Sequence, residues 1–362
     1  MADERVFGMG DDPLAEPTWP ALTEDEIARA VAATWSGSAP SAIEWRGARP
    51  LSSTVGVRLD GGERLVVKRM PLRLRDGVAL AEEHRFMAHL RERGIPVPEV
   101  RATVGDGAPD GFVYEVHRVG SGHDRYRADF SWSPYRDTDD ARAAGAMLAR
   151  LHRVAADFDA PARPARPLLA TLHSDVVTAF EWHIARRPAV ARFLGERDWR
   201  AEVPGWSADL TGVAPLWTHG DWHGTNLLWK DHEVTSVIDF GLADRTTAVF
   251  DLATAVERTA IDWVSLRDGG PANVREDQII ALIQGYRSVR GPSTAEQNLL
   301  PDLLPLVHIG YELSEIDYFL TIANDQRNAE IAYQDWLLGH LHWYETEEGR
   351  ALRTLVRDLF VS

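Results

Sequence analysis

The sequence contains no cysteine in its 362 residues, which excludes disulfides, thiol nucleophiles and cysteine-ligated metals. It also lacks any apolar run close to the roughly 18 residues that a membrane-spanning helix needs. The first 25 residues do not combine a basic start with an apolar stretch, so they do not resemble a secretory signal. These absences predict a cytoplasmic protein that does not act in a membrane.

Basic residues are outnumbered, with 39 Lys and Arg against 55 Asp and Glu, and the formal net charge is −16. A field of this sign opposes non-specific binding to nucleic acids and to anionic membranes, and it attracts cationic ligands. A charged surface kept for solubility explains the same number equally well. The charge therefore argues against a nucleic-acid partner more firmly than it argues for a particular ligand.

The length permits one large domain or two smaller ones, and the pattern along the chain favours two parts. Residues 1–20 are rich in Asp, Glu, Pro and Gly and are expected to form a mobile arm. Residues 21–118 read as a small strand-rich lobe, and residues 119–362 read as a larger helical lobe. The predicted fold class is α+β.

The first lobe begins with a predicted helix over residues 23–35, because Thr23 and Glu26 have the spacing of a capping box. A second helix is expected over residues 79–93, ended by Gly94. The alternating Val55, Val57 and Leu59 predict a strand. Further strands are expected over residues 65–70, 99–104 and 112–116.

The second lobe contains amphipathic patterns that predict long helices over residues 140–154, 176–194 and 304–322. Two short apolar runs, residues 227–229 and 234–238, resemble strands on either side of a polar turn. Between these strands and the preceding helices lies a polar stretch that contains the most specific motif in the sequence.

That stretch is His219-Gly-Asp-Trp-His-Gly-Thr-Asn226, and Ile-Asp239-Phe-Gly follows it. Asp221 and Asn226 are five residues apart, and Asp239 comes 13 residues after Asn226. Carboxylate and amide oxygens are the ligands that Mg²⁺ prefers. Phosphoryl transfer to an alcohol needs such ligands, together with a group that orients the attacking hydroxyl.

These motifs resemble those of the aminoglycoside phosphotransferase and choline kinase family, relatives of the protein kinases. The resemblance implies a protein-kinase-like bilobal fold and the use of ATP, or another nucleoside triphosphate, with Mg²⁺. Asp221 would be the catalytic base, and Asn226 and Asp239 would be the metal ligands. His219 and His223 would support the loop rather than transfer protons.

The resemblance extends upstream to about residue 50. Lys68 stands where the family places its phosphate-binding lysine, and Glu83 is the candidate ion-pair partner, on the helical face that points inward. The sequence departs from the kinases in lacking Gly-x-Gly-x-x-Gly. Ser52 and Ser53, in a turn expected over residues 51–56, would cover the phosphates instead, and the adenine-binding segment is expected over residues 114–117, which include Glu115 and His117.

The sequence says least about the molecule that accepts the phosphoryl group. Tyr311 and Glu315 share one face of the helix predicted over residues 304–322, and they would suit a cationic, hydroxylated substrate. Asp124 lies in the aromatic and charged segment 122–132, which either walls the substrate pocket or packs on the helical lobe. For any one residue of the helix over residues 304–322, a place in an amphipathic core helix with solvated acids is a better explanation than substrate binding.

We therefore expect a small-molecule kinase whose acceptor is an antibiotic, either aminoglycoside-like or nucleoside-like. A metabolic kinase of homoserine, choline or a sugar is the alternative. Two minor alternatives are a metallohydrolase that uses His219, Asp221 and His223, and a nucleotide-binding protein without catalysis. The sequence does not indicate the oligomeric state.

Overall fold

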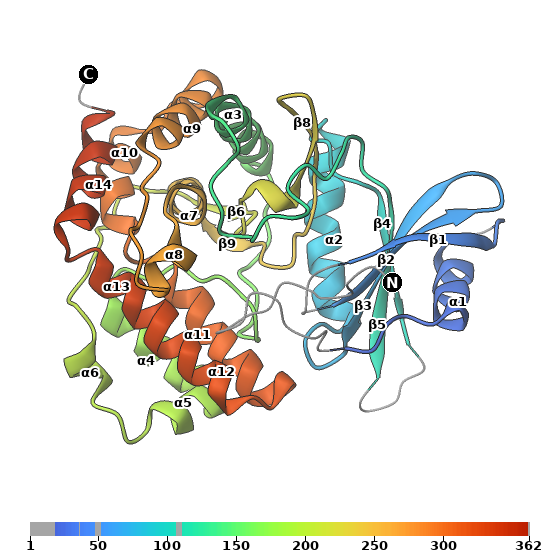
Figure 1. Ribbon diagram of the computed structural model, residues 1–362, viewed down its shortest axis with the longest axis horizontal. Helices are drawn as coiled ribbons and strands as arrows, with labels where there is room; N and C mark the ends of the chain where they lie inside the picture. The colour runs from blue at the N-terminus through green and yellow to red at the C-terminus, as the bar shows by residue number, and fades with distance from the viewer. Residues whose placement is uncertain (1–18, 36, 48–51, 106–110, 361–362) are drawn as a thin grey trace. The chain divides into compact units, whose positions relative to one another are not determined.

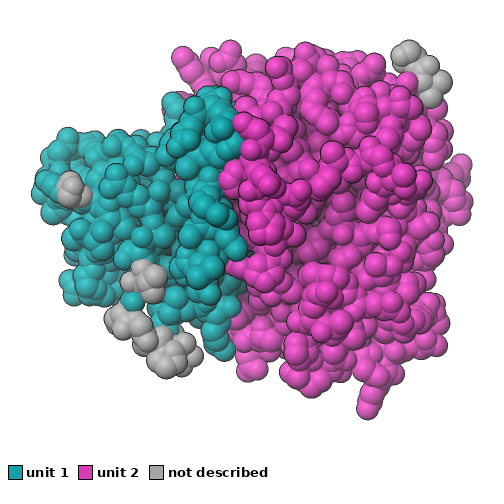
Figure 2. Space-filling view, turned by 180° about the vertical axis from the view of Figure 1, so that it is seen from behind, with its two compact units in different colours: residues 1–121, 236–238 teal, residues 122–235, 239–362 magenta. Residues whose placement is uncertain are grey.

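The computed structural model describes residues 19–35, 37–47, 52–105 and 111–360. The arm expected over residues 1–20 lies outside this description up to residue 18. The chain forms two compact units, drawn in teal and magenta in Figure 2. Unit 1 comprises residues 1–121 and 236–238, and unit 2 comprises residues 122–235 and 239–362.

Unit 1 is built on an antiparallel sheet whose strands follow the order β1-β2-β3-β5-β4 (Figure 1). The strands are β1 (Pro40–Arg46), β2 (Ser53–Leu59), β3 (Arg64–Pro71), β4 (Val100–Val104) and β5 (Phe112–Arg118). Gly62, with φ +83°, closes the tight turn between β2 and β3, since a residue without a Cβ adopts this conformation at low cost. The sequence predicted β2 to β5, whereas β1 has no clear alternation.

One helix covers each face of this sheet (Figure 1). α1 (Glu24–Thr34) packs Ile27 and Val31 against the buried side chains of β2 and β3, such as Val57. α2 (Gly77–Glu92) packs Leu80 against Met70 on the opposite face. Both predicted helices are confirmed, and so is the capping box at the start of α1.

A buried ion pair fastens α1 to the sheet. Nη1 of Arg69 lies 2.6 Å from Oε1 of Glu26, and the Tyr114 hydroxyl donates to the same oxygen at 2.9 Å. Burial alone would raise the pKa of Glu26, but the hydrogen bonds from Thr23, Arg69 and Tyr114 lower it to about 2. The carboxylate is therefore ionised over the whole physiological range.

Unit 2 is mainly helical (Figure 1). Its principal helices are α3 (Thr138–Ala155), α4 (Val176–Arg186), α5 (Pro188–Leu194), α6 (Trp199–Glu202), α7 (Ala248–Ala260), α8 (Trp263–Arg267), α9 (Glu276–Val289), α10 (Thr294–Leu303), α11 (Ile309–Tyr318), α12 (Gln326–Ile331), α13 (Gly339–Trp343) and α14 (Glu347–Asp358). π-helical turns cover Phe319–Ala323 and Ala332–Leu338. α3 and α9 approach closely at Gly145 and Gly285, where an added Cβ would lie 2.0 Å from a backbone oxygen of the other helix.

The structure corrects two of the predicted helices. The helix expected over residues 176–194 is two helices, because Pro188 disfavours helical geometry at Arg187, which has φ −126° and ψ 89°. The helix expected from Leu304 begins only at Ile309, since Leu304 caps α10 and a turn follows it. The predicted helix over residues 140–154 is confirmed as α3.

Four short strands of unit 2 carry the polar motif. β6 (Pro215–Thr218) pairs with β9 (Asp244–Thr247), and β7 (Leu227–Lys230) pairs with β8 (Glu233–Val237). The sequence predicted β7 and β8 but not β6 and β9. Within the described residues, no helix is long and apolar enough to cross a membrane.

Residues 236–238 leave the helical unit and pack with unit 1. The Val237 amide donates to the carbonyl of Pro96 at 2.9 Å, and the Ser236 hydroxyl donates to the carbonyl of Ser121 at 3.1 Å. Unit 1 is therefore completed by a segment that is more than a hundred residues downstream of the rest.

Candidate active site

The His219–Asn226 motif forms the connection between β6 and β7, and it ends in a 3₁₀ turn at Gly224–Asn226. Gly220 has φ +77°, and a Cβ there would lie 2.4 Å from the carbonyl oxygen of Leu242. Only glycine combines this backbone conformation with so close an approach. The glycine of the motif thus lets the loop lie against the segment that contains Asp239.

Asp251, in the first turn of α7, holds the backbone of this loop. Its Oδ2 accepts from the His219 amide at 3.0 Å, and its Oδ1 accepts from the Gly220 amide at 2.9 Å. The His152 ring nitrogen Nε2 lies 3.0 Å from Oδ2, and the other ring nitrogen lies 2.8 Å from the Tyr286 hydroxyl. Asp251 and His152 are almost fully buried, so this brace is rigid and dry.

Asp221 and Asn226, predicted as base and metal ligand, are brought together. The Asn226 amide nitrogen donates to Oδ2 of Asp221 at 3.0 Å and to its backbone carbonyl at 2.9 Å. Nε2 of His223 lies 3.3 Å from the same carboxylate oxygen and 3.1 Å from the Asn226 nitrogen. His223 is buried, and its other ring nitrogen lies 2.8 Å from the Thr225 hydroxyl.

The other oxygen of the Asp221 carboxylate faces Arg258, which the sequence analysis did not identify. Nη1 of Arg258 lies 3.5 Å from Oδ1 of Asp221, and the arginine is only 3% exposed. Burial alone would raise the pKa of Asp221, but the charges of His223 and Arg258 hold it well below the usual range for an aspartate. Arg258 stands seven residues after Asp251, two helical turns along the same face of α7. From this spacing the sequence could have indicated that both side chains point toward the same loop.

Asp239 lies in the connection between β8 and β9 and has φ +61°, an uncommon conformation for a residue with a side chain. The Phe240 ring that follows it packs on the His219 ring, with 4.8 Å between centroids. The segment is thereby fixed against the catalytic loop. Asp239 is exposed.

The residues present fit a divalent metal. The Asn226 amide nitrogen is occupied by Asp221, which leaves the amide oxygen as the group that can ligate an ion. The Asp239 carboxylate supplies a second oxygen. Hard oxygen donors of this kind suit Mg²⁺ or Ca²⁺.

The metallohydrolase alternative is not supported. In the part of the chain that the structure describes, two groups of three residues bring metal-ligating atoms within 4.8 Å of one another, and neither contains His219, Asp221 or His223. These groups are Glu257, His308 and His340, and Asp137, Asp139 and His232. In the first, the two imidazoles stack at 4.1 Å and 22°, so their ring planes do not converge on a common ion.

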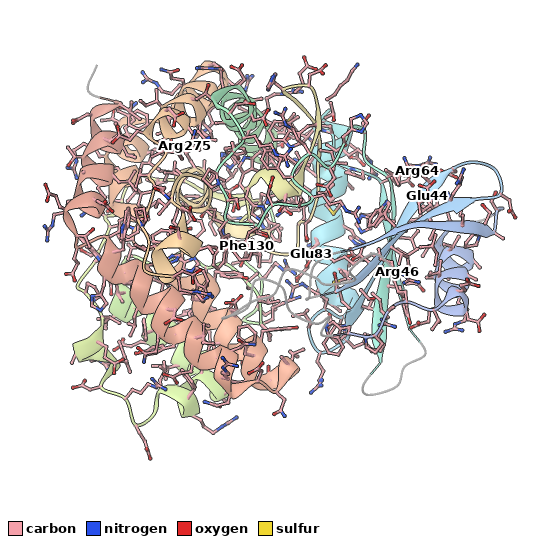
Figure 3. The ribbon with its side chains drawn as sticks, in the orientation of Figure 1. Glu44, Arg46, Arg64, Glu83, Phe130 and Arg275 are labelled. Carbon is pink, nitrogen blue, oxygen red and sulfur yellow. The ribbon has the colours of Figure 1, made fainter. Side chains whose placement is uncertain are left out.

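In unit 1, Lys68 lies on β3. Glu83 lies on α2, where Figure 3 labels it. The predicted orientation of Glu83 is confirmed, because it is 4% exposed on the face that also buries Phe86 and Leu90. Nε of Arg75 lies 3.0 Å from its carboxylate, an ion pair that the sequence analysis did not predict. Lys68 is half-buried and stands directly across from Glu115 on β5.

The sequence predicts that residues 114–117 bind adenine through their backbone groups. These residues lie within β5, which pairs with β3 on one side and β4 on the other, so their backbone groups are used in the sheet. The Glu115 side chain is buried and lies 2.6 Å from Nε2 of His84 and 3.7 Å from Nε2 of His117. Burial would raise the Glu115 pKa, but His117 and His84 hold it well below its usual range.

The predicted turn over residues 51–56 is also partly wrong. Ser53 begins β2, and its hydroxyl donates to the carbonyl of Pro20 at 3.1 Å. Ser52 lies just before the strand, with its hydroxyl 3.2 Å from that of Thr54. Leu51, the first residue of the predicted turn, lies outside the described residues.

Two of the residues predicted for the substrate, Tyr311 and Glu315, are linked to Arg258, the ion-pair partner of Asp221. The guanidinium of Arg258 lies over the Tyr311 ring at 4.6 Å, and the Tyr311 hydroxyl donates to Oε1 of Glu315 at 2.9 Å. Both side chains are buried in α11. Burial and the neighbouring Glu312 raise the Glu315 pKa well above the usual value, and burial raises the pKa of Glu312 to about 8.

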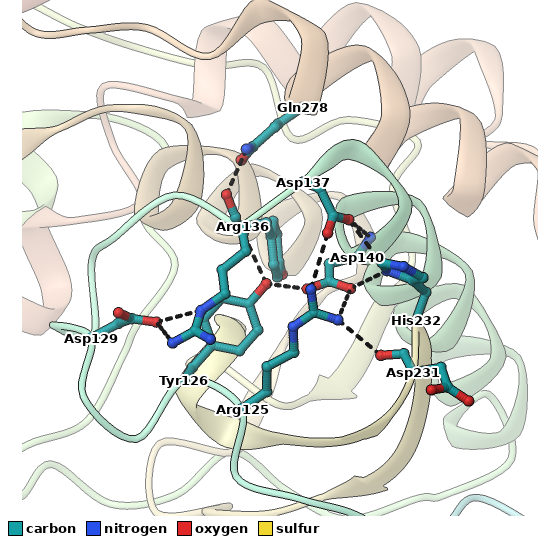
Figure 4. Close-up of polar contacts among 10 residues, drawn as sticks. Arg125, Tyr126, Asp129, Arg136, Asp137, Asp140, Asp231, His232 and Gln278 are labelled. Carbon is teal, nitrogen blue, oxygen red and sulfur yellow. Dashed lines mark hydrogen bonds and ion pairs between the residues drawn. The ribbon is translucent and has the colours of Figure 1, made fainter.

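The segment that contains Asp124 packs on the helical unit (Figure 4). Arg125 donates to Asp140 at 3.1 Å and to Asp137 at 3.0 Å, and the Tyr126 hydroxyl donates to Asp140. Further along the segment, Trp132 is buried and lies 6.4 Å from Tyr311, centroid to centroid. Asp124 itself is exposed, and its role in substrate binding stays a prediction.

The sequence profile described as "Phosphotransferase enzyme family" matches residues 48–292, more than half of the chain. The chain belongs to this family. The phosphotransferase is 27% identical over 267 residues to a homoserine kinase of Methylobacillus flagellatus, which covers 70% of this chain and 74% of that protein. A homoserine kinase of Brucella anthropi is 26% identical over 250 residues, or 66% of this chain and 68% of that one.

Solved structures show the same fold at low identity. A putative aminoglycoside phosphotransferase from Ralstonia eutropha has a TM-score of 0.55 and 15% identity, covering 86% of this chain and 93% of that one. The phosphotransferase thus has the predicted protein-kinase-like α+β fold and is a small-molecule kinase that phosphorylates a hydroxyl group.

Proposed function

We propose that this phosphotransferase transfers the γ-phosphoryl group of ATP, in the presence of Mg²⁺, to a hydroxyl group of a small cationic molecule. The observation that carries the proposal is the arrangement around Asp221. One carboxylate oxygen is bound by Asn226 and His223, and the other faces a buried arginine. A carboxylate fixed in this way can accept a hydrogen bond from an attacking hydroxyl and orient it in line with the phosphorus.

The proposed roles follow from the chemistry of each residue. Asp221 orients the acceptor hydroxyl and receives its proton as the new phosphorus–oxygen bond forms and ADP leaves. The Asn226 amide oxygen and the Asp239 carboxylate would hold the metal, which supplies positive charge against the phosphate oxygens when it is bound. Lys68 provides a further cation for the phosphates, and Glu83 and Glu115 are the carboxylates on its side of the sheet.

The adenine contacts are expected after β5 rather than within it. The strand ends at Arg118, and the Val119 amide still donates to the carbonyl of Arg64 on β3 at 3.3 Å, so residues 120 and 121 are the first beyond the bonds between β5 and its neighbours. This placement replaces the segment predicted from the sequence.

A cationic acceptor is favoured by the acids behind Tyr311. Glu312 and Glu315 have raised pKa values because they are buried beside one another, and the Glu312 pKa of about 8 keeps this side chain mainly protonated at neutral pH. A bound ammonium group would stabilise their ionised forms and release protons. Acceptors with amino groups, such as aminoglycoside-like or nucleoside-like antibiotics, have this property.

A metabolic role is the second candidate, and a specific observation favours it. The two relatives reported above are named homoserine kinases and match this chain over about two thirds of their length or more. Homoserine carries both a hydroxyl and an ammonium group, so it meets the same chemical requirement.

The same fold occurs in the solved complex of an amicoumacin kinase with AMP-PNP, Ca²⁺ and its ligand. The TM-score is 0.51 at 14% identity, and the match covers 89% of this chain and 88% of that one.

The test is ATP consumption with Mg²⁺ against aminoglycosides, nucleoside antibiotics, homoserine and choline, with Asp221→Asn as the inactive control. Turnover of an antibiotic at low Michaelis constant supports the first version, and turnover of homoserine or choline alone supports the second. Turnover that persists in Asp221→Asn would refute the assignment of the site.

A further inference from the structure

α7 delivers two side chains to the catalytic loop, and only one of them has a clear structural purpose. Asp251 binds the backbone amides of the loop, whereas Arg258, two turns further, reaches its carboxylate. The distance of 3.5 Å between Nη1 of Arg258 and Oδ1 of Asp221 is that of an ion pair without a short hydrogen bond. Oδ1 therefore keeps a lone pair free for a further donor.

The guanidinium of Arg258 is held in place by two aromatic rings from different parts of unit 2. It lies 4.6 Å from the Tyr311 centroid and 5.2 Å from the Trp132 centroid, and these rings meet edge to face at 83°. A planar delocalised cation lies well against such faces, and a lysine ammonium cannot reproduce this fit. The position of the cation is thus determined by the rings and not by its contact with Asp221.

The electrostatic surroundings keep Arg258 charged although it is buried. Glu257 precedes it on α7, and Glu312 lies on the neighbouring α11; together with Asp221 and Tyr311 they raise the arginine pKa against the effect of burial. Nε of Arg258 nevertheless has no hydrogen-bond partner among the described residues.

We infer that Arg258 is a positioning residue for phosphoryl transfer, holding the Asp221 carboxylate so that Oδ1 points at the acceptor hydroxyl. The inference rests on the proposed function, because it requires Asp221 to receive that hydroxyl. Asn226 and His223 fix Oδ2, and Arg258 fixes the rotation that remains about the side chain. A neutral side chain at this position would leave the carboxylate free to turn, and small misplacements of reacting groups reduce rates strongly.

The experiment compares Arg258→Gln with a matched control, Arg197→Gln. Arg197 also lies over two aromatic rings, Phe193 at 4.6 Å and Tyr333 at 4.9 Å, and pairs with Glu330 at 3.0 Å, but none of these residues belongs to the catalytic loop. The full-length enzyme is assayed with MgATP and either homoserine or an aminoglycoside. Where neither is phosphorylated, phosphate release from MgATP alone, with water as acceptor, is the readout.

We expect Arg258→Gln to lower kcat by about 10- to 100-fold while the KM values for ATP and acceptor change less than about threefold. Arg197→Gln should leave kcat unchanged. In an Asp221→Asn background, Arg258→Gln should cost less than about threefold, because the residue through which it acts is already disabled. Arg258→Lys should recover part of the rate, and it replaces Arg258→Gln if the latter does not fold.

Other outcomes are equally informative. Equal losses from Arg258→Gln with and without Asp221, or a rise in KM at constant kcat, would overturn the positioning role. Unchanged turnover in Asp221→Asn alone would instead overturn the proposed function, before Arg258 is considered.

Discussion

Each unit of the molecule contains a carboxylate paired with a buried arginine that lies over an aromatic ring, and the two pairs differ in how completely they are bonded. In unit 1, Arg69 lies over Phe112 at 4.4 Å and pairs with Glu26 at 2.6 Å. Both Glu26 oxygens receive further hydrogen bonds, from Tyr114 to one and from the Thr23 amide to the other at 2.9 Å. Every acceptor of the pair is used, and the pair serves the fold.

In unit 2, Arg258 pairs with Asp221 at the longer distance of 3.5 Å, and only Oδ2 of the carboxylate is bound by neighbouring side chains. The same residue types thus form a pair in which both carboxylate oxygens accept side-chain or backbone hydrogen bonds in unit 1, and a pair in which one oxygen has only the longer contact to the arginine in unit 2. A buried charge that lacks a hydrogen bond lowers the stability of the fold. Such a charge is retained where a substrate is to supply the missing hydrogen bond.

The largest expected effect is a loss of turnover when the carboxylate of the Asp221–Arg258 pair is replaced. Asp221→Asn should lower turnover by about 10³-fold or more, because the amide cannot receive the hydroxyl proton. Its urea midpoint should stay close to that of the wild-type enzyme. The measurement is steady-state ATP consumption together with urea denaturation followed by circular dichroism, and a large loss of stability with intact turnover would invert the comparison.

Next comes the brace behind the catalytic loop. Asp251→Asn should reduce the free energy of unfolding by about 3 kcal/mol. The two carboxylate oxygens now accept from the amides of His219 and Gly220, and the side-chain nitrogen of asparagine would place a donor against one of these donors. Turnover should also fall, since the loop loses its support. Urea denaturation at pH 7 measures the stability, and a change below 1 kcal/mol would show that the brace is dispensable.

The structural pair of unit 1 should behave in the opposite way to Asp221. Glu26→Gln should destabilise the protein by about 2 kcal/mol at pH 7 and leave kcat within about twofold. The Glu26 pKa is lowered to about 2, so its contribution is complete above the unfolded-state value of 4.5 and is lost as the pH falls through about 2.

The measurable consequence is a pH-dependent difference between the two proteins. Urea midpoints of wild type and Glu26→Gln should differ most at neutral pH and converge as the pH is lowered from 4.5 toward 2. A difference that stayed constant over this range would mean that packing, and not the ionised carboxylate, is what the substitution removes.

The smallest change in stability is expected for an ion pair that is exposed to solvent, and it serves as the reference for the two pairs above. Arg200 and Glu181 lie 2.7 Å apart with more than half of each side chain exposed. Arg200→Gln should change the free energy of unfolding by less than about 0.5 kcal/mol, since solvent screens such pairs. A larger change would show that ion pairs in this protein cannot be ranked by burial.

Much of the site could be predicted because its residues are close in sequence. Asp221, Asn226 and His223 fall within one short loop, so their contacts follow from spacing alone, and the capping box of Thr23 and Glu26 is equally local. The break at Pro188 was also visible, because proline disfavours helical geometry in the residue before it. It was overlooked because the apolar spacing continues across it.

Other features depend on contacts that a single sequence does not reveal. Arg258 is one of many arginines on amphipathic helices, and its partner lies 37 residues away in another element. β6 and β9 are only four residues each, too short for an alternating pattern to stand out, and they form because they pair with one another. The position of β5 inside the sheet likewise depends on the order of the strands, which a single sequence does not reveal.

The return of residues 236–238 to unit 1 has a consequence for how the protein is made. A ribosome that has synthesised the first 121 residues has not yet produced the segment whose Val237 amide bonds to Pro96. The amino-terminal lobe can therefore complete its hydrogen bonding only after the whole first stretch of the helical lobe, residues 122–235, has been synthesised. A gene cut after codon 121 would yield an amino-terminal fragment that lacks residues 236–238 of its own lobe, so complementation would require this three-residue segment, carried by the other fragment, to find its place in trans.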